Sequence, residues 1–178
     1  STVLTGSNSY QGQTSITAGT LQVGNGGTTG NLGAGAVTNN AMLAIDRSDT
    51  VALANDIAGT GNLVQQGTGT TVLTGSNSYQ GTTRIDAGTL QVGNGGATGT
   101  WGPGAVTNSG TLAIDRSDTL ALANDIGGTG SLKQMGTGTT VLNGNNSYQG
   151  QTSINAGTLQ VGNGGVTGNL SAGAVTNN

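Results

Sequence analysis

The chain has 178 residues, of which 36 are glycine, one is proline and none is cysteine or histidine, and its formal net charge is −3. These numbers exclude disulfide scaffolds, thiolate or imidazole zinc sites and Ser–His catalysis. Four basic residues are too few to neutralise a nucleic-acid backbone, so we expect no nucleic-acid partner. No run of 18 apolar residues could cross a membrane as a helix, so we expect no membrane span in this segment.

Short strands are predicted wherever apolar and small or polar residues alternate. In chain order these runs include "TLQVG" at 20–24, "MLAID" at 42–46 and "TVALA" at 50–54. Alternation with a period of two indicates strands with one buried face. The runs are separated by stretches such as "GNGG" at 24–27, whose residues tolerate turns and positive φ. No segment shows the apolar spacing of a helix, so the sequence predicts an all-β fold.

The chain is a tandem repeat in which each unit starts 69 positions after the one before. Residues 2–69 and 71–138 are identical at 53 of 68 aligned positions, and a third copy starts at 140. We therefore divide the chain into repeats at 2–70 and 71–139 and a partial repeat at 140–178, all within a single solenoid domain at 1–178. Because the chain begins and ends inside a repeat, we expect it to be part of a longer array.

The leucines that lead the strands suggest smaller units inside each repeat. Successive leucines lie 22, 20 and 27 positions apart, and these spacings add up to the period of the repeat. We therefore predict a parallel β-solenoid with about 7–8 coils of about 20–27 residues, three coils per repeat, and a rise of about 14 Å per repeat. The predicted inward-facing core columns are Leu21, Val23, Leu43, Ile45, Leu63, Leu90, Val92, Leu112, Ile114, Leu132, Leu159 and Val161.

The stretch "GTGTTVLTGSNSYQGTTRIDAGTLQVGNGG" at 67–96 resembles the autotransporter-associated β-strand repeat, and the same pattern returns at 136–165 and in part at 2–27. The resemblance implies a right-handed parallel β-helix in the passenger of a bacterial surface or secreted protein. It also implies an outer-membrane barrel elsewhere in the parent chain and progressive folding outside the cell. It implies no cofactor. The expected location is extracellular or on the cell surface.

Two sets of polar residues recur at fixed positions. Asparagine at a solenoid turn usually bonds unpaired backbone groups, and tyrosine there usually covers the adjacent coil. We expect these turn and ladder roles for Asn8, Tyr10, Asn77, Tyr79, Asn146 and Tyr148. The motif "IDRSD" at 45–49 and 114–118 places two carboxylates around an arginine, and we interpret it as a solvated turn with a weak ion pair rather than a cation site.

Trp101 stands where the other copies have Leu32 and Leu170, which favours packing over stacking against a sugar. No cluster of acidic, basic or nucleophilic residues departs from the repeat, so we expect no enzyme activity. Two functions remain open. The first is a rigid stalk that supports secretion and adhesion, and the second is a filament built by end-to-end self-association. The candidate partners are neighbouring repeats of the same chain, another copy of the chain bound end to end, and a host surface or glycan.

Overall fold

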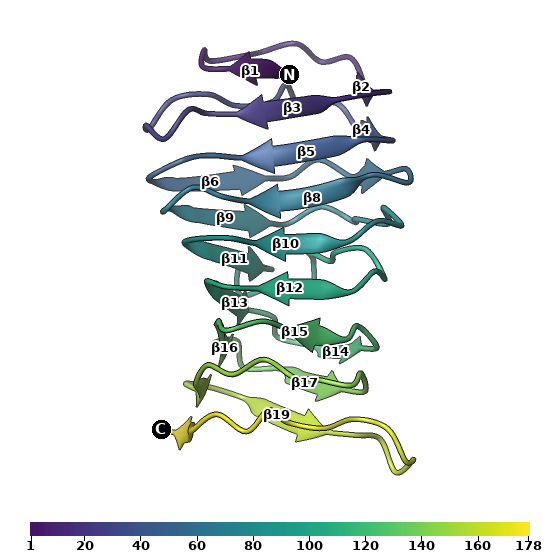
Figure 1. Cartoon of the computed structure of the whole chain (residues 1–178), viewed down its shortest axis with the longest axis vertical. Helices are drawn as coiled ribbons and strands as arrows, with labels where there is room; N and C mark the ends of the chain where they lie inside the picture. The colour runs from purple at the N-terminus through teal and green to yellow at the C-terminus, as the bar shows by residue number, and fades with distance from the viewer.

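The computed structural model describes residues 1–178 and contains twenty short β-strands and no helix. The strands stack in parallel into about nine coils, with the two termini at opposite ends of the stack (Figure 1). The expected all-β solenoid is therefore confirmed, with a coil count close to the predicted seven or eight. No helix in the structure is long and apolar enough to cross a membrane.

Three faces surround the core, and each coil contributes one segment to each face. The first face is a seven-stranded sheet of β1 (Thr2–Leu4), β3 (Thr20–Val23), β5 (Met42–Ile45), β8 (Asn62–Gln65), β10 (Thr83–Ile85), β12 (Val106–Asn108) and β15 (Ile126–Gly127). The second face is a seven-stranded sheet of β6 (Thr50–Leu53), β9 (Thr70–Leu73), β11 (Thr89–Val92), β13 (Thr111–Ile114), β16 (Ser131–Gln134), β18 (Thr152–Ile154) and β20 (Val175–Asn177).

The third face carries two shorter sheets. These are β2 (Thr14–Ile16), β4 (Val37–Asn39) and β7 (Ile57–Ala58), followed by β14 (Thr119–Leu122), β17 (Thr139–Leu142) and β19 (Thr158–Val161). The segments 77–79 and 100–102 lie between the two sheets, because Ser78 N donates to Ile57 O and Asn77 N donates to Thr100 Oγ1. Neither segment is a strand.

The core is continuous along the whole stack because like side chains lie above one another. Leu21 pairs in register with Leu43, which pairs with Leu63, and on the second face Leu90, Leu112 and Leu132 follow the same rule. Twenty-four buried residues form one cluster. Full burial of one leucine side chain stabilises the fold by about 1.5–3 kcal/mol, so each coil depends on the apolar contacts of its neighbours.

The sequence repeat does not consist of three coils, as the leucine spacing suggested. Three register steps lead from Leu21 to Thr83 on the first face, and Leu90 follows a little later on the second face. The longest leucine spacing, from Leu63 to Leu90, is thus one coil plus a step to the next face. The coils themselves differ in length: a short one leads from Thr2 to its partner Leu21, and a long one leads from Thr83 to its partner Val106.

Each repeat therefore turns by one face relative to the previous repeat. The equivalent strands β3, β11 and β19 belong to the first, second and third faces. One repeat covers three coils and about a third of the next, which gives a rise of about 16 Å instead of the expected 14 Å when strands lie about 4.8 Å apart. Three repeats bring a feature back to its original face after ten coils.

Candidate functional site

The predicted core residues lie mainly inside the stack. Those that are buried are Val23, Leu43, Ile45, Leu63, Leu90, Val92, Leu112, Ile114 and Leu132. Leu21 and Leu159 are half-buried against the same core. Val161 is 46% exposed, because it belongs to β19, the last strand of its sheet. The leucines form columns on three faces rather than one column, since each repeat is turned by one face.

The predicted turn asparagines link successive coils by hydrogen bonds, which we call the bracket role. Asn77 accepts a hydrogen bond from Ile57 N at 2.9 Å and donates to Thr100 O at 2.7 Å, so its amide joins the coil before it to the coil after it. Asn146 repeats both contacts, with Ile126 and Asn169. These amides satisfy backbone groups where the sheet is interrupted, which leaves them no free atoms directed at a ligand.

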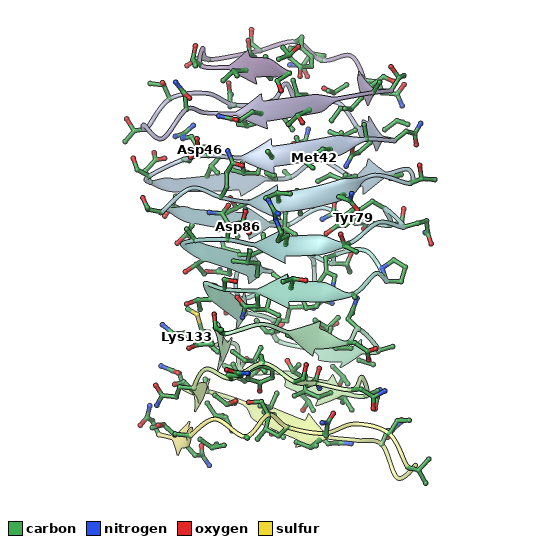
Figure 2. All side chains as sticks on the ribbon, in the orientation of Figure 1. Met42, Asp46, Tyr79, Asp86 and Lys133 are labelled. Carbon is green, nitrogen blue, oxygen red and sulfur yellow. The ribbon has the colours of Figure 1, made fainter.

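Two of the three predicted tyrosines are buried. Tyr79 and Tyr148 lie within the stack, and each hydroxyl is 2.7 Å from a threonine Oγ1, of Thr83 and Thr152 respectively. Figure 2 shows Tyr79 in the middle of the stack, whereas the exposed Lys133 lies at its surface. Tyr10 is 39% exposed. Burial raises the pKa of Tyr79 from 10.0 to about 12, because desolvation disfavours the phenolate.

This pKa predicts loss of stability at alkaline pH. The neutral Tyr79 contributes its full stabilisation below pH 10, the pKa of the unfolded side chain, and loses it as the pH rises towards about 12. We expect phenolate absorbance and loss of the β-sheet circular dichroism signal to develop together in that range. Tyr79→Phe should cost about 1 kcal/mol at neutral pH and should be less sensitive to alkali. Ionisation of all three tyrosines in a fully folded chain would contradict the assignment.

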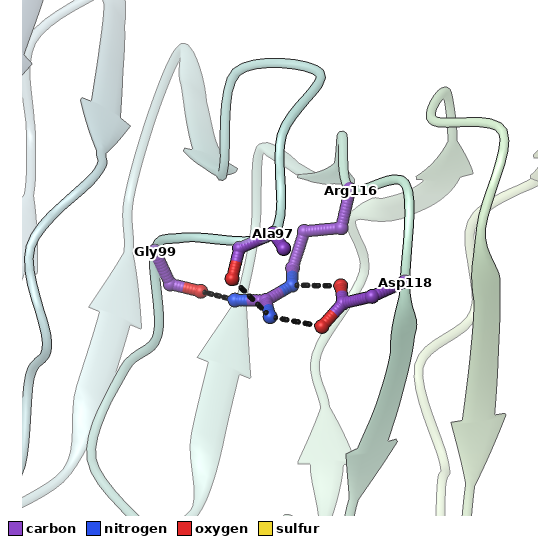
Figure 3. A network of polar contacts seen from close by, with 4 residues as sticks. All are labelled: Ala97, Gly99, Arg116 and Asp118. Atoms are coloured by element: carbon purple, nitrogen blue, oxygen red, sulfur yellow. Dashed lines mark hydrogen bonds and ion pairs between the residues drawn. The ribbon is translucent and has the colours of Figure 1, made fainter.

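The arginines of the two "IDRSD" motifs are buried, which corrects the expected solvated turn. The Arg116 side chain is only 8% exposed, and its Nη2 lies 2.7 Å from Asp118 Oδ2. Its Nη2 also donates to Ala97 O at 2.8 Å, and its Nη1 donates to Gly99 O (Figure 3). A guanidinium with five donors suits this arrangement, because it can bind a carboxylate and several carbonyl groups at once.

The arginine therefore holds the glycine-rich loop that follows β11. Gly99 has φ +95°, and a Cβ there would overlap Leu73 O, so only glycine fits where the loop returns to the stack. Arg47 makes the equivalent contacts with Asp49 and Gly30 in the first repeat. Hydrogen bonds from the arginines lower the pKa of Asp49 and of Asp118 below the usual value of 3.8.

The same Arg-x-Asp spacing occurs at the end of β10, but there the arginine is exposed. Arg84 and Asp86 form an ion pair at 2.8 Å, but both side chains are exposed, at 53% and 40%. The sequence pattern R-x-D therefore does not reveal which arginine is buried. That depends on whether a glycine-rich loop from the preceding coil covers the guanidinium.

Nowhere do three or more carboxylate, histidine or cysteine side chains gather in a way that could hold a metal ion. Asp46 and Asp115 lie on the first and second faces, at the ends of β5 and β13, and do not form a common site. Sequence reasoning missed two buried amides, Gln65 and Gln134, whose side chains bond backbone carbonyls at the next turn.

Trp101 is buried, with 8% of its surface exposed, and joins the apolar cluster. Its Nε1 is the buried side-chain polar atom without a hydrogen-bond partner. Gly102, which follows it, approaches Tyr79 so closely that a Cβ would overlap Tyr79 O. The rim of a surface groove includes Trp101 and Pro103.

Comparisons with known proteins identify a family for the repeated sequence. The family described as "Passenger-associated-transport-repeat" matches residues 1–23, 63–92 and 132–161. Over 136 residues, or 76% of its length, the chain is 39% identical to the "Adhesin BmaC autotransporter" of Brucella suis biovar 1 (strain 1330). The chain spans about 4% of the length of that relative. No solved structure matches. The resemblance indicated by residues 67–96 is therefore confirmed: three stretches of the chain match the passenger-associated-transport repeat, the first of them shorter than the other two.

Proposed function

We propose that residues 1–178 form a rigid stalk segment in the passenger of a bacterial autotransporter, on the cell surface or secreted. The observation that carries the proposal is the unbroken apolar core, which runs through every coil and is repeated with little change from one sequence repeat to the next. A rod of this kind is stiff, and its length grows with each added repeat. The relative from Brucella suis is named an adhesin, which supports a role in presenting a binding region elsewhere in the parent protein.

We also propose that the same architecture supports secretion. Each coil pairs only with its neighbours, so a newly exported coil can fold on the last folded coil without waiting for distant parts of the chain. Each addition buries leucine, isoleucine and valine side chains and forms parallel backbone hydrogen bonds. That free energy opposes return of the chain through its export channel, and we propose this as the role of the repeats in secretion.

Small-angle scattering tests the stalk against the filament. The chain, and a version with one additional copy of 71–139, should both be rods of fixed size at all concentrations, and the longer one should exceed the shorter by about 16 Å. Growth of the particles with concentration would instead favour the filament. Lysine at Val3 and Val175, two exposed residues in the end strands β1 and β20, provides the control, because charged edges block strand pairing between molecules.

A further inference from the structure

A groove opens on the third face where the segments 77–79 and 100–102 run beside β14. It encloses about 450 Å³. One wall is apolar and includes Trp101, Pro103 and Leu120, while Ser78 and Gln80 contribute exposed polar side chains. None of the twelve residues that line it is charged.

The first repeat has the corresponding groove on the second face, with a volume of about 350 Å³. It is lined by Leu32 and Ala34 at the positions of Trp101 and Pro103. The third repeat keeps the smaller pair, Leu170 and Ala172. In a chain of near-identical copies, the middle groove alone has acquired a tryptophan and a proline.

These replacements leave the scaffold contacts of the groove intact. In the first repeat, Asn31 accepts from Asn8 N and donates to Asn8 O. In the second repeat, Thr100 performs both tasks through one hydroxyl, accepting from Asn77 N at 2.7 Å and donating to Asn77 O at 3.1 Å. The coil pairing is thus preserved while the surface beside it changes.

The chemistry of the groove points to an uncharged ligand with both apolar and hydroxyl surfaces. A charged ligand would lose hydration here without meeting an opposite charge. A sugar ring has an apolar face that can pack on the wall formed mainly by Pro103 and Leu120, with the 8% of Trp101 that is exposed beside them, and hydroxyls that can bond Ser78 and Gln80. We propose that the Trp101 groove is a binding site for a neutral oligosaccharide, a property separate from the stalk function.

The chain contains a single tryptophan, so its fluorescence reports on this groove alone. We would titrate the whole chain with cellotriose, maltotriose and triacetylchitotriose, and measure Trp101 emission and heat of binding. At least one sugar should give a saturable change with one site per chain. The variant W101L/P103A should weaken that binding at least tenfold by calorimetry, and it should fold normally because the first and third repeats carry the same residues.

A gain-of-function variant tests the proposal independently. Introducing N31T, L32W, A34P and V51L copies the middle groove into the first repeat, and the calorimetric stoichiometry should rise from one to two. Absence of binding by all three sugars, binding unaffected by W101L/P103A, or a stoichiometry that stays at one would overturn the proposal. Binding confined to an acidic heparin fragment would also overturn it.

Discussion

Leu132→Asp should uncouple the coils on either side of β16 and cost at least about 4 kcal/mol of unfolding free energy. Removing the side chain of a buried leucine costs about 2–5 kcal/mol, and the carboxylate adds the cost of an unpaired charge in the core. Leu132 is 1% exposed and stacks on Leu112. Because coils depend on their neighbours, we expect a two-step urea transition and a new proteolytic site near β16.

Lys133→Asp is the matched control, since Lys133 is the next residue of the same strand but is exposed. It should change the stability by less than about 0.5 kcal/mol. In the parent protein, the proposed role in secretion predicts less passenger on the cell surface for Leu132→Asp than for Lys133→Asp. Equal urea midpoints for the two variants would show that the Leu90–Leu112–Leu132 column does not couple the coils.

Arg116→Ala is expected to release the glycine-rich loop at 93–99. The variant loses hydrogen bonds from a buried guanidinium to Asp118, Ala97 and Gly99, and it leaves carbonyl groups without a donor. Bonds that involve a charged group are worth about 1.5–3 kcal/mol, so we expect a loss of about 2–3 kcal/mol. Hydrogen exchange at 93–99 should rise more than exchange in β11, because the strand keeps its ladder on both sides.

Arg84→Ala controls for loss of an Arg-x-Asp ion pair. It removes a pair of similar length, at 2.8 Å, in which the arginine is 53% exposed. Exposed pairs contribute about 0–1 kcal/mol, so the effect should be small and hydrogen exchange in the glycine-rich loop should not change. Similar losses for Arg84→Ala and Arg116→Ala would mean that burial of Arg116 adds nothing to the fold.

The sequence was sufficient for the fold class but not for the path of the chain around the axis. Alternation in runs such as "TLQVG" indicates strands, and the near-identity of the repeats favours stacking, because a coil that contacts only its neighbours tolerates copying. The sequence did not indicate which face of the stack each strand occupies. Leu63 and Leu90 both lead predicted strands, yet Leu63 pairs with Leu43 and Thr83 on the first face, whereas Leu90 pairs with Thr71 and Leu112 on the second. The leucine spacing alone therefore does not reveal on which face a strand joins the stack.

The roles of some site residues could also be predicted from the sequence, and the roles of others could not. The bracket role of Asn77 was foreseeable, since the motif leaves backbone groups to be bonded. The burial of Arg116 was not, because it depends on an earlier loop, at Ala97 and Gly99, that folds back over the guanidinium. The burial of Trp101 agrees with the leucines at its position in the other repeats, but the adjoining groove arises only when β14 lies beside it.

The turn of each repeat by one face bears on the straightness of a long array. Each repeat interrupts its sheet once, at 8–10 and 31–33 on the second face, 77–79 and 100–102 on the third, and 146–148 and 169–171 on the first. If all interruptions lay on one face, that side would be more compliant and the rod would curve. Distributed over three faces in turn, they do not single out one side of the rod, so we expect them to give a long array no preferred bending plane.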